Sequence, residues 1–544
     1  MKRKASPGLA LSALLAASLA VLGVRGCVGA GRTPSAAAAT APERAVPPTV
    51  AGPEAALSPD ELDADDREAF AAVLRKKFTR AHVRADEAVL TFKDEAARRA
   101  FLARAAAAGL TVLGRLDALN AVRVRVGDYA AFVSELGAHA DDYAGVTINP
   151  ILAANPPAAE ARSARVGAPV GAGLLAALGV EGDNAGWGAG VTIAVLDGGS
   201  AADATLGTRL RYLDIGYGVV GGGEDGRHGT AVAALAAGAS ADARGVAPAA
   251  EVLSIRVTGV DGASDAFALA QGIFAAVDAG AQVINISLGG YATNAVLGEA
   301  VEYALAAGAA VVASSGNDQA AQLAWPAAYP GVVSVGAVDA AGHQAIFSNS
   351  GPSLQLTAPG YAVQTAGLGG TRVNFSGTSA SAPVVSGAIA AVLSASPGLT
   401  PLQAADVLTT HANDGGAAGA DPDYGNGSVN LGWALARGDK SRVDPALTSQ
   451  TYDPARGTVT VVVQNQGAQT LDGLTLAAGA GGEPRAYTVP ALAAGASMGI
   501  AVPVDPAVLA EADGLVVRFE VIPPAGLVDQ NPGNNRKSGV ITRD

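Results

Sequence analysis

The sequence contains very little of several residue types, and each shortage limits what the chain can be. Only one of its 544 residues is a cysteine, Cys27, so stability must come from packing rather than from disulfides. Lysine and arginine (36) are outnumbered by aspartate and glutamate (49). The resulting net charge of -13 argues against a nucleic-acid partner, whose phosphates need clustered basic residues. Only 16% of residues are charged and 49% are hydrophobic, which excludes wholesale disorder and allows a large core.

The N-terminus has the pattern of an export signal. A basic start, MKRK, precedes an uncharged apolar run at residues 8–24, and residues 28–30 (VGA) offer a cleavage site of small residues. The alternative is a retained membrane anchor, for which the run is short. Cys27 leaves lipid attachment open, although Arg25 departs from that processing pattern. We expect a signal peptide at residues 1–30 and a secreted or cell-envelope protein, with membrane contact only through this segment or a lipid on Cys27.

The composition and the hydrophobic pattern change several times along the rest of the chain, and each change predicts a domain boundary. Residues 31–84 have the composition of an Ala/Pro-rich linker followed by a helix. Residues 85–152 show strand and helix patterns in the order β-α-β-β-α-β, which predicts a small ferredoxin-like α+β domain. Residues 165–440 alternate continuous apolar runs with Ala-rich helical stretches, which predicts an α/β domain whose parallel sheet has helices on both faces. Short alternating strands at residues 446–544 predict a β-sandwich.

Four polar residues stand at the ends of strands or the starts of helices in the predicted α/β domain. Asp197 ends one apolar run, Asn317 follows another, and His228 and Ser379 lie where helices begin. Because these positions share one edge of a parallel sheet, we expect the four side chains to meet there. Each also fits a structural role, as a cap, a buried histidine or a turn residue. A carboxylate, an imidazole, an amide and a hydroxyl together are the groups that serine acyl transfer requires.

The motifs around these residues resemble those of the subtilases, the subtilisin-like serine proteases. The matching blocks are VTIAVLDGG, RHGTAVAALAAG, RGVAPAAEVLSIRV, QVINISLGG, VVASSGND, FSNSGPSLQLTAPG and FSGTSASAP. The chain order Asp, His, Ser is also that of subtilisin. The resemblance implies a serine endopeptidase in which Ser379 attacks the peptide carbonyl and His228 carries the proton. It also implies that Asp197 orients His228 and that Asn317 donates a hydrogen bond to the oxyanion.

The resemblance further implies where a substrate lies. An extended peptide would add as a strand between two segments, Gly262-Ala263-Ser264 and Ser287-Leu288-Gly289. Neither these segments nor residues 313–316 carry a charge, so we expect an apolar or broad preference for the residue before the cut. One motif departs from the family pattern, since the aspartate is usually followed by Ser-Gly or Thr-Gly, whereas Asp197 is followed by Gly198 and Gly199.

The expected partners and cofactors come from the same resemblance. It implies no cofactor for catalysis and leaves a structural calcium site open without locating one. Residues 85–152 resemble the propeptide domains of subtilases, so we expect polypeptide substrates and an intramolecular inhibitor that is cut off within residues 151–170. Residues 446–544 resemble a cell-adhesion-related, immunoglobulin-like bacterial module. The expected function is an exported serine endopeptidase made as a zymogen; the alternative is a catalytically inactive envelope binding or adhesion protein on a protease-like scaffold.

Overall fold

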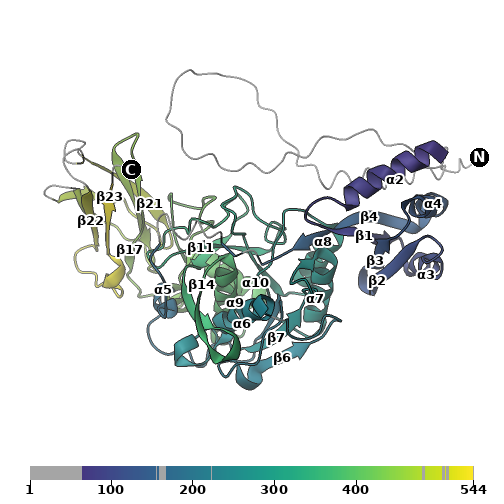
Figure 1. Cartoon of the computed structure of the whole chain (residues 1–544). Coiled ribbons are helices and arrows are strands. Elements are labelled where there is room, and N and C mark those ends of the chain that lie inside the picture. The colour runs from purple at the N-terminus through teal and green to yellow at the C-terminus, as the bar shows by residue number, and fades with distance from the viewer. Residues whose placement is uncertain are drawn as a thin grey trace, which may run out of the picture.

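Three units follow one another along the chain in the computed structural model (Figure 1). The structure describes residues 64–154, 156–157, 167–221, 223–480, 484–504, 509 and 514–542. The predicted signal peptide, with Cys27, and most of the predicted linker lie outside the described residues. The predicted fold class is confirmed: a small α+β unit, a parallel α/β unit and an antiparallel β-sandwich occur in that order.

The N-terminal unit packs helices against one face of an antiparallel sheet. Its helices are α2 (Ala64–Phe78), α3 (Glu95–Arg104) and α4 (Tyr129–Ala138), and its strands are β1 (Val83–Phe92), β2 (Leu110–Leu116), β3 (Ala121–Val126) and β4 (Tyr143–Leu152). The sheet order β2-β3-β1-β4 is that of a ferredoxin-like unit. Asp94 and Asp128 cap α3 and α4 by accepting backbone N–H bonds. Strand β1 begins two residues before the predicted boundary at residue 85.

The central unit is built on a nine-stranded sheet in the order β15-β16-β12-β11-β10-β9-β5-β7-β6. Its strands are β5 (Thr192–Asp197), β6 (Leu210–Leu213), β7 (Glu251–Arg256), β9 (Val283–Ile286), β10 (Ala310–Ser314), β11 (Val333–Val338), β12 (Leu356–Pro359), β15 (Ala412–Asn413) and β16 (Ser428–Val429). Every pairing except that of β15 with β16 is parallel. Two short strands, β13 (Val363–Ala366) and β14 (Arg372–Phe375), form a separate hairpin.

Helices cover both faces of this sheet. Helices α6 (Gly223–Ala237), α9 (Thr378–Ala395) and α10 (Pro401–Thr410) pack on one face, and α7 (Ala266–Asp278) and α8 (Ala295–Ala306) on the other. Two short helices, α5 (Leu174–Ala177) and α11 (Leu431–Ala436), flank the first group. Because both faces are covered, β9 and β10 are buried throughout, as their continuous apolar runs predict. Helix α9 is long and apolar enough to cross a membrane, but 89% of it is buried in this core.

The C-terminal unit is a sandwich of two antiparallel sheets. One sheet has the order β17-β18-β21 and the other β20-β19-β22-β23. The strands are β17 (Pro445–Asp453), β18 (Thr458–Asn465), β19 (Thr475–Ala480), β20 (Arg485–Thr488), β21 (Ser497–Pro503), β22 (Leu515–Ile522) and β23 (Arg536–Ile541). Inward-facing residues of both sheets, such as Val461, Leu476 and Phe519, share one core. This unit lies at the opposite end of the molecule from the N-terminal unit (Figure 1).

The helix-free face of the N-terminal sheet packs on α7 of the central unit. Side chains alternate along β1, so Ala88 and Leu90 face the unit's own helices while Val89 joins the core around α7. Phe267, at the start of α7, is fully buried. Its ring lies 3.0 Å from the position that a Cβ on Gly114 would take. A small residue at position 114 therefore lets α7 approach the sheet.

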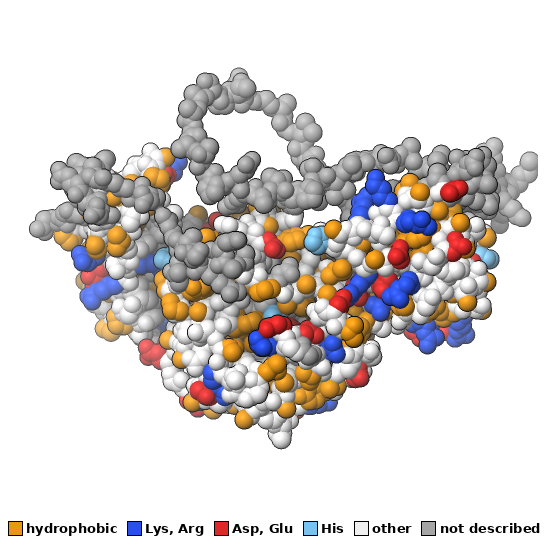
Figure 2. All heavy atoms as spheres, viewed as in Figure 1, with side chains coloured by type: hydrophobic (Ala, Val, Ile, Leu, Met, Phe, Trp, Pro, Cys, Tyr) orange, Lys and Arg blue, Asp and Glu red, His pale blue; other side chains and the backbone are white. Residues whose placement is uncertain are grey.

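Two arginines of the N-terminal unit converge on one buried carboxylate of the central unit. Arg123 Nη1 lies 2.9 Å from Asp265 Oδ2, and Arg84 Nε lies 3.3 Å from the same oxygen. The Asp265 side chain is 4% exposed and also caps α7 by accepting from the Ala268 N–H. Arg84 pairs with Asp261 as well. On the face shown in Figure 2, many of the basic and acidic side chains lie over the N-terminal unit.

Arg123→Ala should weaken the docking of the N-terminal unit, because nearly buried Asp265 would keep only Arg84. We expect the free energy of unfolding of this unit to fall by about 3 kcal/mol, as for other broken buried ion pairs. The measurement is hydrogen exchange at the amides of β1 and β3 in the full chain carrying Ser379→Ala to prevent self-cleavage.

Arg125→Ala is the matched control for this variant. Arg125 lies on the same strand and face, but it is 57% exposed and pairs with Glu87. Its partner Glu87 is 8% exposed, but without Arg125 this carboxylate still accepts from the Asn149 amide at 3.0 Å and lies 3.9 Å from Arg123, so amide protection should change little. Equal losses of protection in the two variants would contradict the role given to the Arg123–Asp265 contact.

Candidate active site

Asp197 and His228 are in direct contact at the carboxyl edge of the parallel sheet. Asp197 is the last residue of β5 and is 1% exposed, and His228 lies near the start of α6. Nδ1 of His228 lies 2.8 and 3.0 Å from the two carboxylate oxygens of Asp197. An ionised carboxylate can only accept, so Nδ1 carries the proton and Nε2 is the free acceptor of the neutral ring.

The surroundings of His228 favour its charged form. Burial by itself lowers the pKa of His228, but the charge and hydrogen bond of Asp197 and the charge of Asp225 outweigh it. The net result is a pKa above the ordinary value for histidine. Phe375 of β14 packs edge-on against the imidazole, with ring centroids 5.3 Å apart. The imidazole of His228 therefore lies between the Asp197 carboxylate and the ring of Phe375.

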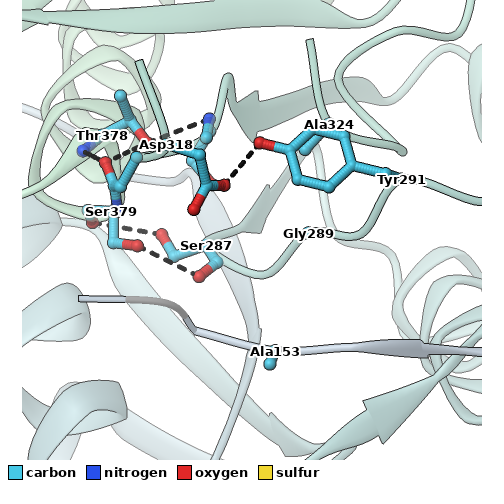
Figure 3. Close-up of a pocket in the computed structure, with 11 residues that line it drawn as sticks. Ala153, Ser287, Gly289, Tyr291, Asp318, Ala324, Thr378 and Ser379 are labelled. Atoms are coloured by element: carbon cyan, nitrogen blue, oxygen red, sulfur yellow. Dashed lines mark hydrogen bonds between the residues drawn. The ribbon is translucent and has the colours of Figure 1, made fainter. Parts of the chain in front are cut away.

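Ser379 is the second residue of α9 and lies in a constricted turn. Gly377, just before the helix, has a φ of 135°, a conformation that residues with a Cβ rarely adopt. Ser379 Oγ donates to the carbonyl of Ser287 at 3.2 Å, and Ser287 Oγ donates to the carbonyl of Ser379, also at 3.2 Å (Figure 3). Within the described part of the chain no hydrogen bond joins Ser379 to His228. The Ser379 hydroxyl is bonded to Ser287 instead.

Asn317 lies three residues beyond the end of β10, and its amide is oriented by the residue before Ser379. Its Oδ1 accepts from the Thr378 N–H at 2.8 Å and from the Thr378 hydroxyl at 3.0 Å. Its Nδ2 lies 3.1 Å from the position that a Cβ on Gly377 would take. The carbonyl end of the amide is thus bound to the start of α9, and the donor end faces the turn before Ser379.

Asn317 and Ser379 line one pocket, which the chain's own N-terminal unit enters. The lining residues are Ala153, Ser287, Gly289, Tyr291, Ser314, Gly316, Asn317, Asp318, Ala324, Thr378 and Ser379. The Ala153 N–H donates to the Gly289 carbonyl, and the Gly289 N–H donates to the Ala153 carbonyl, both at 3.0 Å. Figure 3 shows Ala153 on the strand that crosses this site. Strand β4 therefore continues into the pocket as an added antiparallel strand.

The six predicted substrate-binding residues take different positions. Ser264, in β8 (Ser264–Asp265), pairs with Leu152 on one side of the inserted strand, and Gly289 pairs with Ala153 on the other. The Ala263 carbonyl accepts from Arg84 at 2.6 Å. The side chain of Leu288 is buried in the core around α7, and that of Ser287 bonds Ser379. Gly262 lies in the preceding turn with a φ of 74°.

One charged residue, Asp318, lines the pocket beside the uncharged segments 287–289 and 313–316. The Tyr291 hydroxyl donates to the Asp318 carboxylate (Figure 3) and accepts from Asn349 Nδ2 at 2.7 Å. Burial and the hydrogen bond to Asp318 raise the pKa of Tyr291, so its hydroxyl stays protonated. Both residues lie just beyond the segments that the sequence pointed to, 287–289 and 313–316, since Asp318 directly follows Asn317 and Tyr291 directly follows Gly290.

In the residues that the structure describes, no three His, Cys, Asp or Glu side chains gather closely enough to hold a metal ion. The site as described consists of the four polar residues, the pocket and the inserted strand. Its chemistry, an imidazole bonded to a buried carboxylate beside a serine at a helix start, is that of acyl transfer without a cofactor.

Comparison with known proteins gives consistent matches over the central unit. The model of the Subtilase family matches residues 188–427. Subtilisin BL of Lederbergia lenta is 37% identical over 249 residues, which cover 45% of this chain and 90% of that protein. An alkaline protease of Shouchella clausii is also 37% identical over 249 residues, covering 63% of its length. A solved structure of the protease domain of PatA is 31% identical and covers 48% of this chain, with a TM-score of 0.44.

These matches span the segment that carries Asp197, His228, Asn317 and Ser379. The identity to Subtilisin BL extends over nearly the whole of that relative. The parallel sheet and its two helical layers agree with the fold that the resemblance implied. The chain belongs to the subtilase family and is a subtilisin-like serine endopeptidase.

Proposed function

We propose that the chain is an exported endopeptidase, made as a zymogen, that cuts peptide bonds through an acyl-enzyme on Ser379. The observation that carries this proposal is the contact of His228 Nδ1 with the buried Asp197 carboxylate, at the sheet edge where Ser379 begins its helix. The roles follow from the chemistry of these groups. Ser379 is the nucleophile, His228 the general base and then acid, and Asp197 the group that fixes the tautomer of His228.

The proposed reaction moves one proton between three positions. As Ser379 Oγ bonds to the scissile carbonyl carbon, its proton passes to Nε2 of His228. The imidazolium that forms is stabilised by Asp197 and then gives the proton to the leaving nitrogen as the C–N bond breaks. Water takes the place of the leaving amine and repeats the transfer, which releases the acid and restores Ser379.

Two donors would stabilise the oxyanion of the tetrahedral intermediate. One is Nδ2 of Asn317, which the two bonds from Thr378 to Oδ1 orient toward the turn before Ser379. The other is the backbone N–H of Ser379. The start of α9 adds the positive end of an 18-residue helix, which favours negative charge at this point. Both donors are fixed before a substrate binds, which is the condition for efficient electrostatic stabilisation.

The zymogen proposal is supported by the course of the chain after β4. Residues 151–153 add as a strand between Ser264–Asp265 and Gly289. Four residues later, Cδ of Pro157 lies 3.6 Å from the position that a Cβ on Gly377 would take. The chain thus crosses the site between Ala153 and Pro157 and occupies the place of a substrate. The proposal of export rests on the N-terminal sequence pattern alone.

Ser379→Ala should abolish reaction with a fluorophosphonate and lower casein hydrolysis by about 10⁴-fold or more, because the nucleophile is lost. Labelling detected by mass spectrometry is the measurement. Ser381→Ala is the matched control, since Ser381 lies two residues further along α9 and donates to the Ala358 carbonyl. The Ser381→Ala variant should react with the fluorophosphonate to the same extent as the unaltered protein. Labelling of a clean Ser379→Ala preparation would remove the assignment of the nucleophile.

Asn317→Ala should lower kcat by about 10²–10³-fold with little change in KM, because an oxyanion donor acts mainly in the transition state. Steady-state kinetics on a peptide substrate give both constants. Asn426→Ala is the control, since the Asn426 amide bonds the Gln355 carbonyl outside the pocket and its loss should leave kcat unchanged. A change confined to KM would instead indicate a role for Asn317 in ground-state binding.

Intact mass should distinguish self-maturation from processing by another protease. The full chain without residues 1–30 should lose its N-terminal unit by a cut within residues 151–170, and the Ser379→Ala variant should stay whole. If both proteins stay whole while the unaltered one still reacts with the fluorophosphonate, the serine is active and maturation needs a second enzyme. A cut in both proteins would show that the chain's own serine does not make it.

A further inference from the structure

A second carboxylate, Asp225, lies beside His228 on the first turn of α6. Asp225 precedes His228 by three residues, a spacing that places two side chains on the same side of a helix. Its side chain is 13% exposed and is therefore largely removed from solvent. No step of the proposed reaction uses this carboxylate, so its position needs another explanation.

The Asp225 carboxylate occupies a space between two glycines. A Cβ on Gly198 would lie 2.1 Å from Asp225 Oδ1, and a Cβ on Gly221 would lie 2.2 Å from Oδ2. The two glycines are themselves joined by a 2.7 Å bond from the Gly221 N–H to the Gly198 carbonyl. A Cβ on Gly198 would also lie 2.4 Å from the backbone carbonyl oxygen of Asp225, so both the carboxylate and the backbone of residue 225 leave no room for a side chain at position 198. This explains why a glycine follows Asp197.

The β7 segment holds the carboxylate in this space. The Thr258 hydroxyl donates to Asp225 Oδ2 at 2.5 Å, and the Arg256 guanidinium lies 3.7 Å from the same oxygen. Arg256 is in turn fixed by the carbonyls of Tyr217, at 2.7 Å, and Gly259, at 3.0 Å. Asp225 thus has one fixed position, set by donors from outside its own helix.

The charges around His228 come from three elements. Asp197 faces it from β5, Asp225 lies on its own helix, and Arg256 of β7 lies behind Asp225. The packed segments β13, β14 near Phe375, and α9 present no carboxylate to the ring, and Arg372 of β14 pairs with Asp203 and Asp242. Asp225 is among the causes that raise the pKa of His228. Burial, followed by the charge of Asp197, raises the pKa of Asp225 itself, against the hydrogen bond of Thr258.

We propose that Asp225 is a positioning residue for His228: its carboxylate, held between Gly198 and Gly221, stabilises the imidazolium that forms when Ser379 loses its proton. The inference rests on the proposed role of His228. Asp225 touches neither substrate nor the reacting atoms and acts through the field that it adds to that of Asp197.

An NMR titration of the His228 imidazole tests this without needing activity. The protein is the full chain with Ser379→Ala, and the signal among five histidines is assigned by its loss in His228→Gln. Adding Asp225→Asn should lower the midpoint of His228 by about one pH unit, since a nearby anion favours the charged ring. Glu224→Gln is the matched control, because Glu224 is the adjacent acid, is exposed and pairs with Arg227. An unchanged midpoint in Asp225→Asn, or an equal change in Glu224→Gln, overturns the proposal; Asp225→Ser replaces Asp225→Asn if the latter does not fold.

Activity provides a second test in the full chain with its serine intact. The acid limb of kcat/KM should move to lower pH in Asp225→Asn by the same interval as the NMR midpoint. Gly198→Ser should lose at least about tenfold in kcat, because the new Cβ would meet both the carboxylate and the backbone carbonyl oxygen of Asp225. A fully active Gly198→Ser variant would contradict this lack of room at position 198. An unaltered protein that fails to react with a fluorophosphonate would refute the proposed function, while the NMR midpoint would still decide the role of Asp225.

Discussion

The buried carboxylate of Asp197 is the constraint on which the rest of the site depends. A charge at the end of a strand covered on both faces is costly unless it is paired and hydrogen-bonded. The Gly198 N–H, at 2.7 Å, and His228, at 2.8 Å, meet that need. His228 can reach Asp197 only because α6 begins beside the end of β5, and this requires close approach of backbone at Gly198 and Gly199. The pair proposed as catalytic thus also satisfies the carboxylate that the parallel sheet buries.

The central unit also provides the surface on which the N-terminal unit docks. Its own helices cover one face of its sheet, and the other face would stay exposed without α7. Docking buries Phe267 and brings Arg123 to Asp265, which already caps α7. The strand that leaves this sheet, β4, then has its direction set and runs into the cleft beside Gly289. Core packing, an ion pair and strand addition therefore all join the N-terminal unit to the central unit.

Much of the fold and the core of the site could be predicted from the sequence, because both rest on local patterns. Continuous apolar runs such as residues 281–288 mark buried parallel strands, and Asp197, His228, Asn317 and Ser379 follow strands or begin helices. The contributions of Asp225 and Asp318 could not be predicted in this way. Each carboxylate matters through partners far along the chain, Gly198 and Thr258 for Asp225 and Tyr291 for Asp318, and no periodicity records such contacts. The contact of Arg123 with Asp265 could not be predicted either, since a charged residue within an alternating strand usually faces solvent.

Strand addition has a consequence for how long the N-terminal unit stays bound. Before any cut, the strand through Ala153 is tethered to its own cleft, so its effective concentration is high and binding costs little entropy. Between Ala153 and Pro157 two of the four peptide bonds join to a proline nitrogen, which bears a ring carbon in place of hydrogen and is more crowded as a leaving group. If the N-terminal unit is the inhibitor proposed above, these proline bonds would slow the cut of a strand that binds as a substrate does. After a cut the covalent tether would be lost, but the contacts of Arg84 and Arg123 with Asp265 would remain. On that proposal, release of activity would depend on the docking surface at α7 as well as on the cut bond.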